Sequence, residues 1–502
     1  MAILISLLFL AIAFVIFATL NAGRAAKKSN ELPSPSKLPI IGNLHQLGSP
    51  GSLLHHSLQS LSNKYGPLML LHLGNIPTLV VSSAEMAEEI LKNHDLAFAG
   101  RPLPSSKGAR QIIYGCTDIA FAPYGEYWRQ ARKICVSNLL SLKRVQSFQL
   151  IREEEVGNMI EEIKSSCSVD VSEMLLSLTS GILSRIALGK KYVEVKDLAR
   201  EMEFLLGSFS AGNFIPWLGW IDVLNGLEAR LKRFSHCMDA FLDQVIDDHL
   251  ISKTNGDEND NEQNLVDVLL HLQKDTNADL HLTKDNLKAI ILDMFIAGIG
   301  STAVALEWTL AELVKNPRIM EKAKEEIRRV IGIKEKVEED DLVQMDYLKS
   351  IIKETLRFHP PGPLLVPHES TTSVRIQGCH ISPKTRVLIN AWAIGRDPRS
   401  WENPDEFIPE RFANNPIDFK GQDFQFIPFG AGRRICPGIS FATSTIELAL
   451  VNLLYWFDWE FPSGTRAEDV DMSEASGIVA HRKFPIHLVP TMVKRSGDLD
   501  SA

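Results

Sequence analysis

The sequence has few cysteines, and their spacing pairs none of them. Six cysteines are scattered over 502 residues without a CxxC motif. This distribution argues against a disulfide framework and fits a reducing compartment. Five of the six are interpreted as ordinary small hydrophobic side chains: Cys116, Cys135, Cys167, Cys237 and Cys379.

Basic charge is also in short supply. The chain has 53 Lys and Arg against 62 Asp and Glu, a formal net charge of −9, which argues against nucleic acid as the main partner. No internal repeat is evident. Hydrophobic residues make up 45% and charged residues 23%, which is usual for a globular protein with a sizeable core.

Charge is absent from the first 20 residues. This stretch is long enough to span a bilayer as a helix. Nothing positive precedes it, whereas Arg24, Lys27 and Lys28 follow, so the positive-inside rule predicts that the rest of the chain stays in the cytosol. A cleaved signal peptide is the alternative, but it would have basic residues before a shorter apolar run. We expect a single-pass membrane anchor over residues 1–22, and no second apolar run of comparable length.

The rest of the chain is expected to form one large domain. Spaced prolines between Leu32 and Pro39 bar helix, so residues 23–43 are predicted to be a semi-rigid hinge. A hairpin is expected over Leu68 to Ser82, helices dominate to Leu356, and short strands return over Val366 to Asn390. The predicted fold class is mainly α with small β-sheets (α+β), over residues 44–502.

The sixth cysteine, Cys436, lies in the glycine-rich loop Phe429-Gly-Ala-Gly-Arg-Arg-Ile-Cys-Pro-Gly438. Glycine lets the backbone fold tightly around a sulfur and lets a bulky partner come close. Pro437 suits the first turn of the following helix, whose N-terminus is electropositive. A thiolate needs such surroundings to stay ionised. A single cysteine cannot make a structural zinc site, but a haem iron needs only one strong axial ligand, and thiolate is one of them.

This loop resembles the signature of the cytochrome P-450 superfamily, the haem-thiolate monooxygenases. The match to Phe-x-x-Gly-x-Arg-x-Cys-x-Gly falls on Phe429, Gly432, Arg434, Cys436 and Gly438. Further segments resemble the family in the family's order: Trp128-x-x-x-Arg132, Glu354-x-x-Arg357 and Phe407-Ile-Pro-Glu-Arg411-Phe412. In detail the chain is similar to the plant microsomal A-type group, which acts in specialised metabolism.

The resemblance implies a cofactor, a partner and a location. The cofactor is haem b (iron protoporphyrin IX), with Cys436 as the axial ligand that binds the iron. The haem-binding residues implied are Trp128, Arg132, His368, Phe429, Arg434, Cys436 and Gly438. A structural network of Glu354, Arg357 and Arg411 is implied to lock the cysteine loop. Electrons would come from NADPH through a flavoprotein reductase docked on the cysteine side, the oxidant would be O₂, and the enzyme would lie on the endoplasmic reticulum membrane.

The stretch from Asp293 to Thr302 resembles the family's oxygen-activating helix but departs from it at one position. The family pattern is Ala/Gly-Gly-x-Asp/Glu-Thr-Thr/Ser, and here Gly300 occupies the acidic position, with Ser301 and Thr302 as the candidate catalytic hydroxyls. Splitting O₂ requires two protons. One hypothesis is that an ordered water fills the space beside Gly300 and relays them. The other is chemistry that relies less on protons, such as dehydration, rearrangement or oxidative coupling. A non-catalytic haem-binding protein is a remote third possibility.

Residues carried over by position to the substrate pocket are mainly apolar, although core packing is the alternative for each. This composition favours a lipophilic small molecule that the enzyme hydroxylates or epoxidises. The predicted pocket residues are Phe121, Phe214, Ala297, Ile299, Leu365 and Ile478.

Overall fold

The structure is a computed structural model that describes residues 32–48, 53–254, 264–274, 281–475 and 477–493. The expected anchor over residues 1–22 and the first part of the expected hinge lie outside the described residues. The boundaries predicted for anchor, hinge and domain therefore stay predictions.

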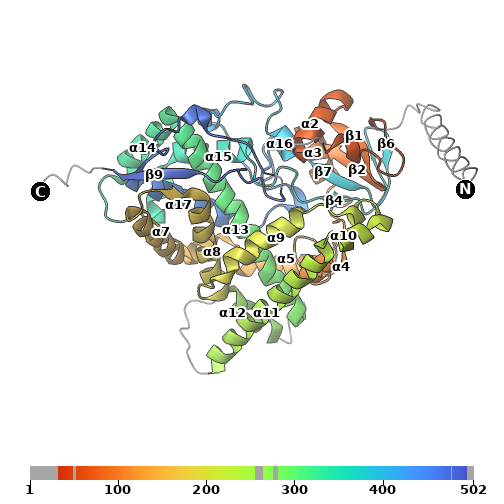
Figure 1. The fold of residues 1–502 in the computed structure, drawn as a ribbon, viewed down its shortest axis with the longest axis horizontal. Coiled ribbons are helices and arrows are strands. Elements are labelled where there is room, and N and C mark those ends of the chain that lie inside the picture. Colours follow the sequence, from red (N-terminus) through yellow and green to blue (C-terminus); the bar gives the residue numbers. More distant parts are fainter. Residues whose placement is uncertain (1–31, 49–52, 255–263, 275–280, 476, 494–502) are drawn as a thin grey trace, which may run out of the picture.

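Helices make up most of the described chain (Figure 1). Their bounds are α2 Leu54–Tyr65, α3 Ala84–Glu88, α4 Lys107–Ile112, α5 Glu126–Asn138, α6 Leu142–Ser147, α7 Gln149–Lys164, α8 Val171–Leu188, α9 Glu194–Gly207, α10 Trp220–Leu224, α11 Leu227–Thr254, α12 Leu265–Lys274, α13 Lys284–Lys315, α14 Pro317–Ile331, α15 Asp346–Phe358, α16 Ala391–Ile394 and α17 Ile439–Trp456.

The strands form small sheets, as the sequence predicts. One sheet has the order β1 (Leu68–Leu73), β2 (Ile76–Val81), β7 (Arg386–Ile389) and β4 (His368–Glu369), and in it β1 and β2 form the expected hairpin. Strand β2 pairs with β7 in parallel, which joins the early and late parts of the chain. The other strands are β3 (Val169–Asp170), β9 (His487–Met492) and β8 (Phe457–Glu460) in one sheet, and β5 (Val374–Ile376) with β6 (Cys379–Ile381) in a hairpin.

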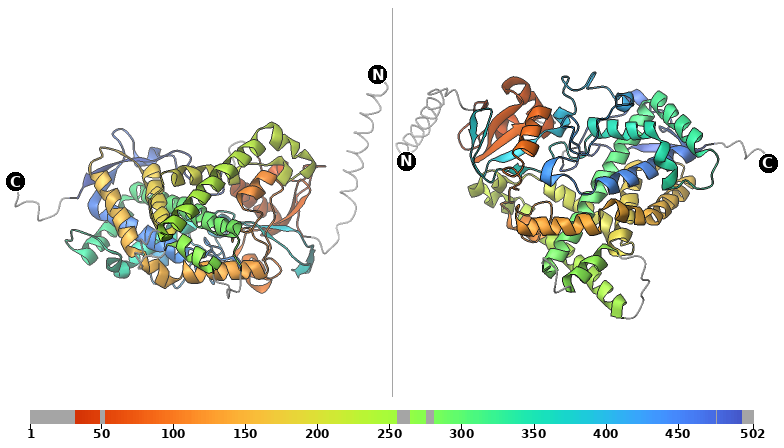
Figure 2. Two further views of the ribbon diagram at one scale, coloured as in Figure 1. Left: turned by 90° about the horizontal axis from the view of Figure 1, so that it is seen from below. Right: turned by 180° about the vertical axis from the view of Figure 1, so that it is seen from behind.

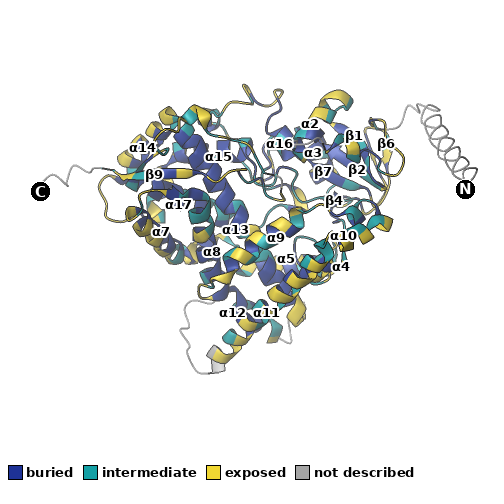
Figure 3. Cartoon of the chain, viewed as in Figure 1, coloured by how far each residue is buried: buried dark blue, intermediate teal, exposed yellow. Residues whose placement is uncertain are grey.

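The long helix α13 organises the helical portion. It begins at a capping box, in which Thr283 Oγ1 accepts from the N–H of Asn286 and Asn286 Oδ1 accepts from the N–H of Thr283. It then packs against α8, α9, α15 and α17. Figure 3 shows α13 and α17 largely buried, whereas the outer faces of α9 and α11 are exposed. The core therefore surrounds the helix on which the candidate oxygen-side residues lie.

Three helices are long and apolar enough to cross a membrane by length and composition alone: α8, α13 and α17. The expectation of no second long apolar run was wrong in this respect. Between 61% and 67% of each apolar window is buried within the protein, and this burial explains their composition without a membrane.

The strands β1, β2 and β7 lie with α2, α3 and α16 at one side of the molecule, and the longer helices fill the rest (Figures 1 and 2). The two portions belong to a single large domain, because segments distant in sequence pair within one sheet and across the core. The predicted fold class, mainly α with small sheets, is confirmed.

Candidate active site

A cavity of about 350 Å³ lies between α13 and the loop that contains Cys436. Its size falls within the range of pockets that enclose a small molecule. Asp293, Ala297, Ser301 and Thr302 on α13 line it from one side, and the loop Pro428–Gly438 lines it from the other. The cavity thus brings together the two stretches that the sequence singles out.

The cysteine loop is shaped by a glycine and by backbone hydrogen bonds. The N–H of Cys436 donates to the carbonyl of Phe429, and the N–H of Gly438 points at Cys436 Sγ at 3.4 Å. Gly432 has φ +68°, and a Cβ there would lie 2.3 Å from the carbonyl oxygen of Leu91. Burial raises the pKa of the Cys436 thiol, while the Gly438 N–H and Arg132 act in the opposite direction. Without a metal the thiol is therefore favoured, and a bound cation would stabilise the thiolate.

Three arginines lie around the cavity. Arg434 donates to the carbonyls of Ala99, Ile119 and Ala122, and its guanidinium lies 4.2 Å from the ring centre of Trp128. The other two reach the backbone as well: Arg132 donates to Ile435, and Arg101 to Ala120, Val366 and Pro367. Trp128 is buried between Arg132 and Arg434 and does not line the cavity.

The part of the cavity wall that contains these three arginines has more positive charge than negative charge. Within the described part of the chain, none of the three makes an ion pair with a carboxylate. Burial and the neighbouring Arg434 lower the pKa of Arg101 to about 9. Burial also lowers the pKa of Arg434 to about 10, with Arg132 adding to the effect. A buried cation without an anionic partner is costly, so the cavity wall is suited to an anionic ligand.

The two nearby carboxyl groups, those of Asp118 and Asp293, do not fully neutralise the charge of these arginines. Asp118 and Asp293 face each other, and Asp293 accepts from the N–H groups of Ile119 and Ala120. Burial raises the pKa of Asp293 to about 7, and burial together with Asp293 raises the pKa of Asp118. Two close carboxyl groups favour sharing a proton over ionising together.

This arrangement fits haem. A sulfur faces the cavity, the wall has arginines without carboxylate partners, and haem is a flat group with two propionates that seek such cations. His368 lines the cavity, and its Nδ1 lies 2.8 Å from the carbonyl of Phe98. Burial and Arg101 lower the pKa of His368 well below its ordinary value. A propionate beside it would raise that pKa and allow Nε2 to donate.

Glu354, Arg357 and Arg411 form a buried network next to the site. Glu354 and Arg357 are fully buried on α15 and make two hydrogen bonds of 2.7 Å with each other. Arg411, on the 3-10 turn η6 (Pro409–Phe412), reaches Glu354 Oε1 at 3.1 Å. Arg357 also donates to three backbone carbonyls. Both arginines bind the Glu354 carboxylate, so no charge in the network lacks a partner, and the fold tolerates the burial of the network.

The position of Gly300 departs from what the sequence suggests. The sequence has no carboxylate at this position of α13, and one hypothesis fills the space with an ordered water. In the structure, a Cβ on Gly300 would lie 1.6 Å from Oε1 of Glu203, a buried residue of α9. An acid from a different helix therefore occupies the space beside Gly300. Asp293 and Glu307 are the nearest carboxylates on α13 itself. Asp293 accepts a hydrogen bond from the N–H of Ile119, and Glu307 accepts one from Ser172, so neither takes the place of the missing acid.

The predicted pocket residues divide into two groups. Ala297, Leu365 and Ile478 line the cavity, but Phe121, Phe214 and Ile299 do not. Ile299 is fully buried in the core. It lies two residues after Ala297, which is more than half a turn of the helix, so its side chain points away from the cavity. Phe214 packs beside the β1–β2 hairpin, and Phe121 packs against the main core. The remaining predicted residues that line the cavity are Arg132, Ser301, Thr302, His368, Phe429, Arg434, Cys436 and Gly438.

Two residues were missed from the sequence. Arg101 gave no signal, because nothing in its local pattern distinguishes it from a surface arginine. Glu203 could have been recognised from the sequence pattern, because it lies on the same face of α9 as the buried Val195 and Ala199. A charged residue on a buried helical stripe indicates a buried carboxylate.

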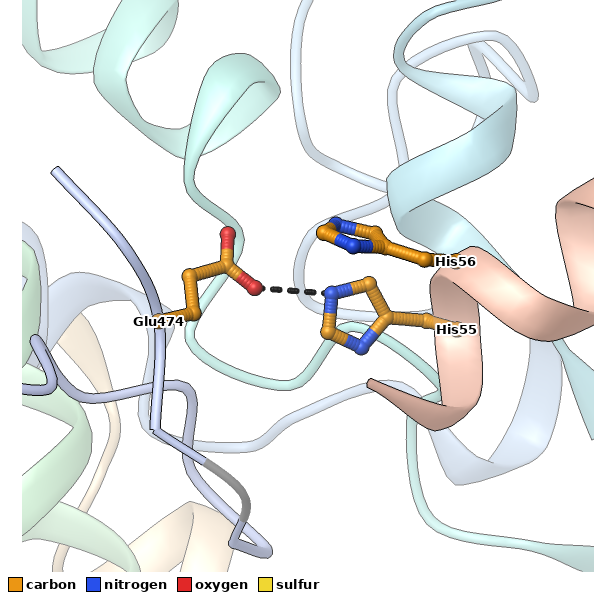
Figure 4. A group of neighbouring side chains, drawn as sticks. All are labelled: His55, His56 and Glu474. Carbon is orange, nitrogen blue, oxygen red and sulfur yellow. Dashed lines mark hydrogen bonds and ion pairs between the residues drawn. The ribbon is translucent and has the colours of Figure 1, made fainter. Parts of the chain in front are cut away.

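A second group of ionisable side chains lies away from the cavity, where α2 meets the C-terminal segment (Figure 4). His55 Nε2 lies 2.7 Å from Glu474 Oε2, and one ligand atom from each of His55, His56 and Glu474 falls within 4.8 Å of the others. The Arg396 guanidinium, 4.1 Å from the ring centre of Trp392, brings positive charge to the same pocket. The direct ion pair and this extra positive charge favour a structural link over a cation site.

Comparisons with known proteins agree with this site. The family model described as Cytochrome P450 matches residues 32–489. The chain is 61% identical to Cytochrome P450 71A1 of Persea americana, over 97% of this chain and 99% of that protein. It is 48% identical to Strychnine-11-hydroxylase of Strychnos nux-vomica, over 91% and 90% respectively. A zebra fish cytochrome P450 solved with progesterone has a TM-score of 0.75 at 26% identity, covering 87% of this chain and 99% of that one.

Proposed function

This chain belongs to the cytochrome P450 family of oxidoreductases, and we propose that it is a membrane-anchored haem-thiolate monooxygenase. In this proposal it hydroxylates or epoxidises a lipophilic small molecule with O₂ and electrons from an NADPH-dependent flavoprotein reductase. The observation that carries the proposal is the cavity itself: the sulfur of Cys436 faces it from one side, and the hydroxyls of Ser301 and Thr302 line the other.

Each part of the cavity wall has a role in this proposal. Haem bound there with a thiolate ligand supplies O₂ activation, because thiolate donates electron density that favours O–O cleavage. Cys436 is the ligand, and its loop holds the sulfur in place. Arg101, Arg132 and Arg434 bind the propionates, which would neutralise their buried charge. Phe429 and Gly438 bound the cysteine side of the haem.

The hydroxyl groups of α13 are suited to positioning protons. Ser301 Oγ donates to the carbonyl of Ala297 at 2.6 Å, the bond of an i to i−4 pair. Thr302 is buried, and its Oγ1 has no hydrogen-bond partner among the described residues. A hydroxyl without a partner is costly unless something in the cavity pairs with it. Both hydroxyls can therefore bind water or oxygen in the cavity.

The lining supports a lipophilic substrate. Most of the cavity wall is apolar, with Leu183, Ala297, Leu365 and Ile478 among its side chains. Such a surface binds apolar ligands by excluding water and orients them through a few polar groups. Relatives are named Strychnine-11-hydroxylase and Phenylacetaldehyde oxime monooxygenase, which supports a substrate from plant specialised metabolism.

Charges on the cysteine side support a reductase partner. Helix α5, which places Arg132 against the cysteine loop, also presents Arg129 and Lys133 to solvent, and Lys143 is exposed nearby on α6. Cations grouped around the cysteine can steer an acidic electron donor. The apolar N-terminal stretch would keep both proteins on one endoplasmic reticulum surface, with this domain in the cytosol.

The alternative of a reaction that relies less on proton delivery, such as dehydration, rearrangement or oxidative coupling, was motivated by the absence of an acid at Gly300. The carboxylate of Glu203 beside that glycine removes the main reason for it. A monooxygenase is therefore the better supported reaction.

Spectroscopy and turnover test the proposal together. The purified protein should give a Soret band and, when reduced under carbon monoxide, the difference band of a thiolate-bound haem. Cys436→Ala should abolish that difference band, because no other cysteine lines the cavity within the described residues. Lipophilic metabolites should be screened for type I spectral shifts, and a hit should be oxidised only with NADPH and reductase. Sustained turnover without NADPH would refute the monooxygenase.

A further inference from the structure

Glu203 is a buried carboxylate without an evident structural reason. It is 7% exposed, and its Oε1 has no hydrogen-bond partner among the described residues. A Cβ on Gly300 would lie 1.6 Å from Oε1 and 2.9 Å from Oε2. The carboxylate thus fills the space that a side chain at position 300 would take. A half-satisfied buried carboxylate destabilises a fold, so stability does not account for it.

The other oxygen of Glu203 is connected towards solvent. Oε2 lies 3.3 Å from Nε2 of His481, whose side chain is 36% exposed. The loop that contains His481 is fixed in place, because the carbonyl of Ala480 accepts from Trp308 Nε1 at 2.9 Å and the Ala480 N–H donates to Pro361. An imidazole has two ring nitrogens, so it can accept a proton on one and release a proton from the other. His481 can therefore pass protons between bulk water and Glu203.

On its other side, Glu203 lies against Gly300 of α13, which does not itself line the cavity. Ser301, the next residue on α13, lines the cavity, whereas Thr302 is two residues from Gly300 and points more than half a turn away from Glu203. Two other ionisable groups near His481, Glu307 and Arg482, lie 3.8 Å from each other. Glu307 accepts a hydrogen bond from Ser172.

We propose that Glu203 takes the place of the acid missing from α13, and that His481 and Glu203 relay protons from solvent to the hydroxyl of Ser301. Glu203 is a positioning residue that acts through that hydroxyl. This inference rests on the proposed monooxygenase function. It differs from the usual acid and alcohol on one helix, because here the acid comes from α9 and its space is provided by Gly300.

The relay balances with the reaction that it serves. The overall reaction is RH + O₂ + NADPH + H⁺ → ROH + H₂O + NADP⁺, in which the substrate C–H bond and NADPH are oxidised and O₂ is reduced. Both protons that end in water reach the cavity through the relay. Glu203 gives up each proton towards the hydroxyl of Ser301 and regains one from His481, so neither residue is consumed.

The first experiment tests the geometry without measuring activity. Gly300→Ala should lower Tm in the wild-type background, because the added methyl group displaces Glu203. In the Glu203→Ala background the same substitution should raise Tm, because alanine favours helix over glycine. Gly157→Ala is the matched control, since Gly157 is helical with nothing within 4 Å of an added Cβ. It should act alike in both backgrounds. An equal effect of Gly300→Ala in both backgrounds would overturn the inference.

The second experiment tests the relay with O₂ as the probe. Without an organic substrate the balance is O₂ + 2 NADPH + 2 H⁺ → 2 H₂O + 2 NADP⁺, and the relay still supplies the protons that enter the cavity. NADPH oxidation by the full-length holoenzyme with saturating reductase should fall at least about tenfold in Glu203→Gln, within the range of acid–base contributions. Its solvent deuterium isotope effect should rise. Placing the carboxylate back on α13, in Glu203→Ala with Gly300→Asp, should restore both values. Asp197→Asn, an exposed acid on α9, should change neither.

The outcomes distinguish a failure of the relay from a failure of the monooxygenase. Wild-type rate and isotope effect in Glu203→Gln would overturn the relay while leaving the monooxygenase intact. Wild-type protein that oxidises no NADPH with reductase would refute the proposed function and the relay with it. In that case the Tm values of the Gly300 and Glu203 variants would still report whether Glu203 fills the space beside Gly300.

Discussion

Several side chains in the cavity wall have pKa values far from their ordinary ones, and Asp293 is the clearest case. Burial raises its pKa from 3.8 to about 7, against the hydrogen bonds from Ile119 and Ala120 that act to lower it. The folded protein therefore binds more protons than the unfolded chain between about pH 4 and pH 7. Since the folded-state pKa is the higher one, stability falls as pH rises through that window.

Asp293→Asn should flatten this fall. Asparagine keeps an oxygen to accept from the two backbone N–H groups but has no proton to lose. The difference in unfolding free energy between pH 4 and pH 7 should shrink by an amount on the order of a few kcal/mol. Urea unfolding at several pH values measures it, with the exposed Asp197→Asn as the control. Parallel pH profiles for Asp293→Asn and wild type would show that Asp293 does not titrate in this range.

At the scale of single residues, the sequence predicts best where a role follows from local chemistry. Cys436 stood out because of the glycines and arginines around it, and the structure places its sulfur at a cavity. Glu203 and Arg101 could not be assigned, because their roles depend on residues about 100 or more positions away in the chain. A helical pattern shows that Glu203 is buried, but only the packing of α9 on α13 shows what it faces.

At the scale of elements, the cysteine loop depends on backbone geometry more than on side chains. Gly430 and Gly432 both have positive φ, at +72° and +68°. They differ in surroundings: a Cβ on Gly432 would lie 2.3 Å from the Leu91 carbonyl oxygen, whereas one on Gly430 would meet only Leu365 Cδ1 at 3.8 Å. The two glycines therefore separate backbone strain from steric conflict.

Gly432→Ala should disrupt the loop, and Gly430→Ala should do so much less. Gly430→Ala incurs only the cost of a left-handed conformation, about 1–2 kcal/mol. Gly432→Ala must also move the backbone at Leu91. We expect a larger drop in Tm for Gly432→Ala, and a smaller fraction of protein with the thiolate carbon monoxide band. Equal losses in the two variants would mean that the contact with Leu91 is not limiting.

Elements were predicted well where periodicity determines them. The β1–β2 hairpin was predicted from a stretch rich in Leu, Val and Thr that Gly74 and Pro77 interrupt, and the structure confirms it. Periodicity could not orient α13. It is apolar on nearly every face because the core surrounds it, so its sequence pattern does not separate Ala297, which lines the cavity, from Ile299, which does not.

At the scale of the whole molecule, Glu474 connects segments from both ends of the chain. Its carboxylate faces His55 on α2 and His359 just after α15, with ring nitrogens 2.7 Å and 3.9 Å away (Figure 4 shows the first). Burial alone would raise the pKa of Glu474, but His359 and His55 outweigh it and hold the pKa well below 4.5. The carboxylate thus remains charged in the folded protein at any pH where the enzyme would act.

Glu474→Gln should weaken the whole fold rather than one site. Removing one partner of a buried ion pair costs about 3–5 kcal/mol, and glutamine, which keeps an acceptor oxygen, should lie at the lower end. Because the folded-state pKa of Glu474 is depressed, its contribution is fully present above about pH 4.5 and is lost as pH falls below it. Thermal unfolding from pH 3 to pH 7 should therefore show wild type and variant converging towards the acid end. The exposed Glu321→Gln, whose partner Arg328 is also exposed, is the control. A constant difference between Glu474→Gln and wild type across that range would show that Glu474 acts through packing and not through its charge.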